Sequence, residues 1–95
     1  MSEKIIFQEG REEWLVGDSS LLFIAAKGDE IISCILPFKT VMDSYSGDMY
    51  FNAKDRQQSC KDIYKKHRDS IHGRCREMIE DGQVDRNGQL IIASI

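Results

Sequence analysis

Two adjacent β-prone runs, apolar on both faces, constrain the fold of this 95-residue chain more than any other feature. The runs span residues 21–26 and 30–36, and Lys27-Gly28-Asp29 separates them. A Gly-Asp pair accepts the positive φ angles of a two-residue hairpin turn, so we expect Lys27 opposite Glu30 and Phe23 opposite Cys34. One face would then hold Leu21, Phe23, Ala25, Ile32, Cys34 and Leu36, and the other Leu22, Ile24, Ala26, Ile31, Ser33 and Ile35. Because a hairpin with one solvated face alternates apolar and polar residues, we expect both faces to be covered.

Two helices are predicted after the hairpin. Pro37 suits a first helical turn, and a helical stripe follows at Phe38, Val41, Met42 and Tyr45. The second helix is expected from Ala53 to Asp81 with Asn52 as its N-cap, and its apolar face comprises Cys60, Ile63, Tyr64, His67, Ile71, Cys75, Met78 and Ile79. If straight, it would measure about 44 Å, whereas a compact domain of this size spans about 32 Å. We therefore expect fraying at its start or a bend near Gly73.

The remaining segments complete the expected order of elements. Residues 4–7 are β-prone, residues 10–17 read as irregular, and residues 90–93 form a final strand after the turn signal Asn87-Gly88. The order is β-β-β-α-α-β, which predicts a single α+β domain over residues 1–95. Its small antiparallel sheet would have a central hairpin, with one short and one long helix on one face.

Composition indicates a folded protein of the cytoplasm. The apolar share is 41% and the charged share 31%, as in globular domains. Cys34, Cys60 and Cys75 are an odd, widely spaced set that forms no disulfide framework. We find no apolar run suited to a signal peptide or a membrane span, so we expect no membrane association.

Several short motifs occur along the chain: Trp14, Leu22-Phe23-x-Ala25, Gly28, Ile32-Ser33-Cys34-x-Leu36, Tyr64-x-x-His67-Arg68-x-x-Ile71, Gly82 and Asn87-Gly88-x-Leu90-Ile91. Together they resemble a small bacterial family known only as a domain of unknown function, number 1488. Cys75 and the preceding Gly73-Arg74 depart from the family pattern. The resemblance implies a bacterial source and a small α+β fold, and it implies no catalytic residues.

No catalytic, cofactor-binding or metal site is predicted. Cys60 and His67 lie seven residues apart, about 10 Å along a helix, so they cannot bind one metal ion without other elements. A Cys34–His67 pair is conceivable, but Cys34 falls in mid-strand on an apolar face, where thiols are inert. The chain has no phosphate-binding loop and no nucleophile elbow. We therefore predict a non-enzymatic interaction or regulatory module, with no cofactor.

Basic residues concentrate in residues 54–76, which hold eight bases and three acids. On one straight helix, five of these bases and one histidine would form a stripe within about 80°: Lys54, Lys61, Lys65, Arg68, His72 and Arg76. The stripe is a candidate contact for an anionic partner such as nucleic acid. The alternative is a solvated face with ion pairs such as Lys65–Asp69. We favour the alternative, because acids flank the stripe and the net charge is −3.

The second face of the hairpin is a candidate surface for self-association. Leu22, Ile24, Ile31 and Ile35 lie on it, and large exposed apolar patches usually mark interfaces. They are expected either to meet a second copy of the chain or to seat the segment that contains Trp14. We slightly favour the homodimer; another protein partner is the alternative.

Overall fold

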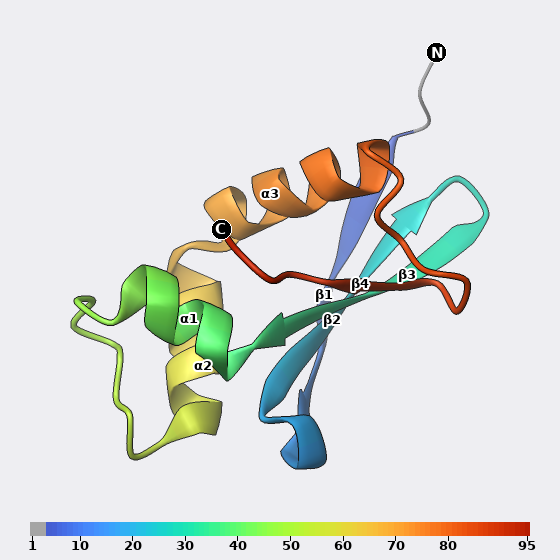
Figure 1. Ribbon diagram of the computed structural model, residues 1–95. Helices are drawn as coiled ribbons and strands as arrows, with labels where there is room; N and C mark the ends of the chain where they lie inside the picture. Colours follow the sequence, from blue (N-terminus) through green and yellow to red (C-terminus); the bar gives the residue numbers. More distant parts are fainter. Residues whose placement is uncertain (1–3) are drawn as a thin grey trace.

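A four-stranded sheet carries three helices on one side of it in the computed structural model, which describes residues 4–95 (Figure 1). The elements are β1 (Ile5–Leu15), the 3-10 turn η1 (Val16–Asp18), β2 (Ser20–Lys27), β3 (Glu30–Pro37), α1 (Phe38–Tyr45), α2 (Arg56–Lys66), α3 (Arg68–Glu80) and β4 (Gln89–Ile91). The strands are ordered β1-β2-β3-β4 in the sheet. The predicted α+β class is confirmed, with one helix more than expected.

The β2–β3 hairpin has the predicted register. Lys27 pairs with Glu30, Ala25 with Ile32, and Phe23 with Cys34. Gly28 has φ of 61°, as the tight turn requires. The alternation of the strand then divides the apolar residues between the two faces of the sheet.

Strand β1 is longer than predicted, and the expectation of an irregular segment at residues 10–17 is wrong for much of its length. Residues 5–8 pair with β2, and Glu13, Trp14 and Leu15 pair with it again after a shift of register. Residues 9–12 form a bulge between these two ladders, and Gly10 adopts φ of 78° within it. The alternation of apolar and polar residues could not predict the bulge, because the extra residues of a bulge break the period of two.

The predicted long helix is two helices, and the break falls at His67 rather than near Gly73. His67 has φ of −106° and ψ of 26°, and it ends α2 and precedes α3. Its Nε2 donates to Oδ2 of Asp48 at 2.8 Å, and its ring stacks on Tyr45 at 4.4 Å. These contacts fix the junction against the end of α1 and the loop that follows. Gly73 lies inside α3.

The start of α2 also differs from the prediction. Its N-cap is Asp55, whose Oδ1 accepts from the backbone N–H of Gln58 at 3.1 Å. Asn52 instead closes the turn before it, where its Oδ1 accepts from the N–H of Lys54 at 3.0 Å. Both residues favour capping, and the apolar periodicity could not decide between them.

Strand β4 pairs with β3 in parallel, whereas a fully antiparallel sheet was expected. Three helices connect these strands, and a helical crossover of this kind returns the chain to run in the same direction. The Asn87-Gly88 turn is present, with Gly88 at φ of 75°. Oδ1 of Asp85 accepts from the N–H groups of Asn87 and Gln89, which leads the chain into β4 instead of a hairpin.

The core lies between the sheet and the helices. Its hairpin members have no exposed area: Leu21, Phe23, Ala25, Ile32, Cys34 and Leu36. They pack against equally buried residues from the helices and the C-terminal segment: Val41, Cys60, Ile63, Ile71, Cys75, Leu90 and Ile92. The predicted apolar stripe of the helices therefore covers one face of the sheet, as expected.

Candidate functional site

The other face of the sheet carries an open apolar surface. Leu22, Ile24 and Ile35 are half-buried there, and Ile31 is 56% exposed. The alternation of the hairpin places all four predicted self-association residues on this side, opposite the helices. The structure therefore brings them together, as the sequence predicted.

Two residues that sequence reasoning missed extend this surface. Ile6 pairs with Ala26, and Ile91 pairs with Ile35. Ile6 is 56% exposed and Ile91 is 55% exposed. Their registers depend on the β1 bulge and on the parallel pairing of β4, neither of which had a sequence signal. We call the resulting set the outer face: Ile6, Leu22, Ile24, Ala26, Ile31, Ile35 and Ile91.

Trp14 does not cover the outer face, so that alternative is wrong. Trp14 pairs with Leu21, whose side chain lies on the helix side of the sheet. It is partly buried and packs against the core. The shift of register in β1 sets this orientation, because a slip of one residue moves a side chain to the opposite face.

The six residues of the predicted basic stripe are not one surface. Lys54 precedes α2 and is exposed, Lys61 and Lys65 are exposed on α2, and Arg76 is exposed on α3. The break at His67 separates the two helices, so the straight-helix angles do not hold across it. Lys61, Lys65 and Arg68 remain together, and they line the same cleft.

His72 is not a surface cation, which corrects its place in the stripe. It is 7% exposed, hydrogen-bonded through Nε2 to the Tyr64 hydroxyl at 2.7 Å, and stacked on Phe7 at 3.8 Å. Burial, followed by the charges of Arg68 and Arg76, lowers the pKa of His72 to about 4. The imidazole is therefore neutral at pH 7.

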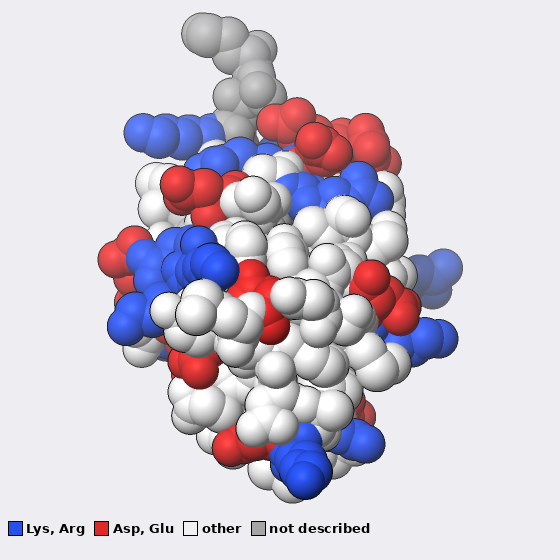
Figure 2. Space-filling view, turned by 90° about the vertical axis from the view of Figure 1, so that its left-hand side faces the viewer, with Lys and Arg blue, Asp and Glu red and all other residues white. Residues whose placement is uncertain are grey.

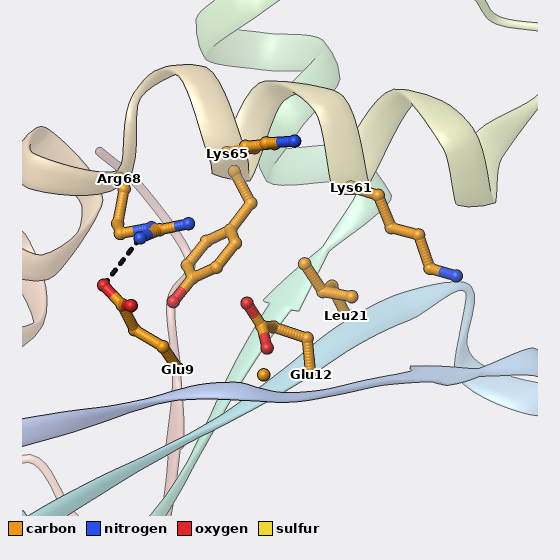
Figure 3. A pocket seen from close by; sticks show the side chains of 8 residues that line it. Glu9, Glu12, Leu21, Lys61, Lys65 and Arg68 are labelled. Carbon is orange, nitrogen blue, oxygen red and sulfur yellow. Dashed lines mark hydrogen bonds and ion pairs between the residues drawn. The ribbon is translucent and has the colours of Figure 1, made fainter.

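A cleft of about 420 Å³ separates the β1 bulge from α2 (Figure 3). Glu9 and Glu12 lie on the strand side, and Lys61, Lys65 and Arg68 lie on the helix side. Leu21 and Tyr64 contribute the apolar part of the lining, and Gly10 completes it. Nη1 of Arg68 donates to Oε1 of Glu9 at 2.7 Å, which joins the two walls.

Charges of both signs mix over the face that carries α1, α2 and their connecting loop. Figure 2 shows basic and acidic side chains interspersed there, with no continuous basic area. Among these groups, Nζ of Lys66 pairs with Asp48 at 3.1 Å. On this face the charges therefore form a mosaic and not the basic patch that is typical of nucleic-acid-binding proteins.

The family model described as "Protein of unknown function (DUF1488)" matches residues 5–92. The chain belongs to the DUF1488 family. The predicted resemblance is confirmed. A DUF1488 protein of unknown function from Shewanella loihica PV-4, known from a crystal structure, has the same fold: its TM-score is 0.77 at 22% identity, and the match covers 99% of this chain and 97% of that one. No curated protein matches the chain.

Thiols and carboxylates of this DUF1488 chain form no candidate centre in the described part. Within residues 4–95, no three His, Cys, Asp or Glu residues are placed to hold a metal ion. Cys34, Cys60 and Cys75 are fully buried, and burial raises the pKa of Cys60 to about 11. A thiol of that kind acts as a small apolar residue. No helix among the described residues is long and apolar enough to span a bilayer.

Proposed function

We propose that this DUF1488 chain is a non-enzymatic interaction module of the cytoplasm that acts through its outer face, and that the partner is a second copy of the chain. The observation that carries the proposal is the open apolar surface opposite the helices. Ile6, Ile31 and Ile91 each expose more than half of their area there. Side chains of this type are normally covered when they gather on one sheet face.

The size of the outer face suits a small dimer interface. Strands β2 and β3 have eight residues each, β1 pairs through seven residues, and β4 has three. With strands about 4.8 Å apart and about 3.3 Å per residue, they give a face of roughly 400 Å². Two such faces would bury on the order of 800 Å², which is the size of a weak interface. A second copy supplies a matching sheet, and two sheets pack well when their strands lie about 30° apart.

The layout of the outer face is self-complementary. Small residues occupy part of its middle, where Ala26 and Ser33 leave room beside Ile24 for isoleucines from a facing sheet. The one acid that the strand pairing places on this side, Glu13, lies opposite Leu22 near an end of the sheet. The pairing also places Gln8, Ser33 and Gln89 in one row with Ile24. A two-fold axis through the middle would therefore bury the isoleucines together with these neutral polar side chains and leave the charge at the rim.

Sedimentation velocity tests the dimer with a matched pair of variants. Ile24→Lys introduces a charge at the centre of the outer face, and Met49→Lys introduces the same charge at a residue that is 83% exposed in the α1–α2 loop. We expect the wild type and Met49→Lys to sediment as dimers at high micromolar concentration. Ile24→Lys should sediment as a folded monomer with an unchanged circular dichroism spectrum.

Two results would contradict the proposal. One is a wild-type chain that sediments as a monomer throughout the micromolar range. The other is an Ile24→Lys variant that remains dimeric, because the dimer would then use a different surface.

A further inference from the structure

The cleft between β1 and α2 exists because the β1 bulge holds the strand edge away from the helix. Residues 9–12 form no pairs with β2, and Phe23 is the residue of β2 that falls opposite them. Gly10, at φ of 78°, turns the bulge, and a Cβ placed there would contact nothing. Bulges often reposition side chains beside functional sites. This one directs Glu9 and Glu12 toward the helix (Figure 3).

The cleft has a rigid apolar floor. Leu21 is fully buried, and Tyr64 is 4% exposed. The Tyr64 ring packs on Phe23 at 4.7 Å, and its hydroxyl is tied to His72. His72 is itself fixed by the stack on Phe7. A floor held in this way can receive an apolar group with little loss of side-chain entropy.

Charged groups above that floor are only partly satisfied. Within residues 4–95, no ion pair involves Glu12, Lys61 or Lys65, although all three line the cleft. Arg68 makes one ion pair, with Glu9, and its Nε is buried with no acceptor among the described residues. A buried donor without an acceptor is unfavourable. The cleft therefore presents spare donors on one wall and a spare carboxylate on the other.

The spacing of the donors selects the shape of a ligand. Lys61 and Lys65 are one helical turn apart, about 6 Å along the axis. Arg68, the first residue of α3, lines the same wall of the cleft beyond the break at His67. Two carboxylates of one small molecule can reach such a row. An ammonium group on the same molecule would lie toward Glu12, on the opposite wall. The volume of about 420 Å³ falls in the range of small-molecule sites.

We propose that this cleft binds a small zwitterion of dipeptide size, with carboxylates at Lys61, Lys65 and Arg68 and an ammonium group at Glu12. An apolar side chain of the ligand contacts Tyr64, the floor residue that keeps some exposed area. The site is separate from the outer face, so this proposal does not depend on the dimer.

An NMR titration of the full-length chain with aspartyl-phenylalanine tests the site. This dipeptide carries two carboxylates, one ammonium group and one aromatic ring. We expect saturable amide shifts in residues 9–12 and 61–68, with a Kd on the order of 1 mM. Glu12→Gln should weaken binding roughly fivefold, as the loss of one partly exposed charge pair implies.

Two controls separate recognition from general charge attraction. N-acetyl-aspartyl-phenylalanine lacks the ammonium group, so Glu12→Gln should not weaken its binding. Lys65→Gln should weaken both probes, whereas Lys54→Gln, outside the cleft, should weaken neither. The unperturbed part of each spectrum reports that the variant is folded.

The proposal is overturned if no saturable shifts occur up to about 10 mM dipeptide. It is also overturned if Glu12→Gln affects both probes equally, because the carboxylate would then not recognise the ammonium group. The Ile24→Lys variant should bind the dipeptide like the wild type. Failure of the dimer and failure of the cleft are thus distinguishable.

Discussion

His72 is a buried neutral imidazole whose surroundings resist protonation. Its folded pKa is about 4, against about 6.5 in an unfolded chain. As pH falls below 6.5 the unfolded chain takes up a proton that the folded chain does not, so stability is lost from pH 6.5 down to about pH 4. Between pH 7 and pH 5 the loss from this residue is at most about 2 kcal/mol. Urea unfolding of the wild type at pH 7 and at pH 5 should show this loss of stability.

His72→Phe isolates this contribution. At pH 7 the variant should lose about 1–3 kcal/mol, because the buried Tyr64 hydroxyl loses its partner. At pH 5 the gap to the wild type should shrink by up to about 2 kcal/mol, because Phe cannot be protonated. His67 is present in both proteins, so any effect it has on the pH dependence is the same in both and drops out of the difference. A gap that does not change with pH would mean that His72 titrates alike in both states.

Residue types and spacing predicted some of these side-chain roles but not others. The five outer-face residues of the hairpin followed from an alternation of two and a turn that fixes register. His72 was misplaced because its angle was counted on a straight helix, and the break at His67 changes that angle. Glu9 and Glu12 were missed because a bulge has no periodic signal. Glu9 and Glu12, which form one wall of the cleft, could therefore be identified only from the folded chain.

At the scale of the elements, the α2–α3 junction shows why the residues near a helix break did not predict where the break lies. Gly73 is the weakest helix former in this region, yet α3 continues through it. The break occurs instead where the His67 side chain is tied to Asp48, a residue 19 positions away. In the same way, β4 runs parallel to β3 because of the three-helix connection, not because of its own sequence. Tertiary contacts thus decided both features.

Two glycine substitutions test this description of α3, and they should have opposite signs. Gly73→Ala places a Cβ in open space on a helix interior, so it should stabilise the chain by about 0.5–1 kcal/mol. Gly82 ends α3 at φ of 75°, and its N–H donates to the carbonyl of Ile79 at 3.1 Å. Gly82→Ala should destabilise by roughly 1–2 kcal/mol, because that conformation disfavours a Cβ. Urea denaturation measures both, and a destabilising Gly73→Ala would place the bend at residue 73 after all.

At the scale of the whole molecule, one side of the sheet serves the stability of the fold, and the other, which stays open, serves contact in the proposed function. The helices cover one side and complete the core, so the outer face adds little to folding of the single chain. A charged substitution such as Ile24→Lys should therefore leave that core intact. The interspersed charges of the helical side provide solubility without a dominant sign.

A dimer formed through the outer face makes stability depend on concentration. Association favours the folded state by mass action, and a hundredfold rise in chain concentration is worth about 2.7 kcal/mol. For a dimer of two 95-residue chains, each kcal/mol shifts the unfolding midpoint by about 2–4 °C, so the expected increase is about 5–10 °C. Differential scanning calorimetry over that concentration range measures it. Ile24→Lys should remove the dependence and Met49→Lys should keep it, whereas a wild-type midpoint that stays constant would show that the folded chain is monomeric.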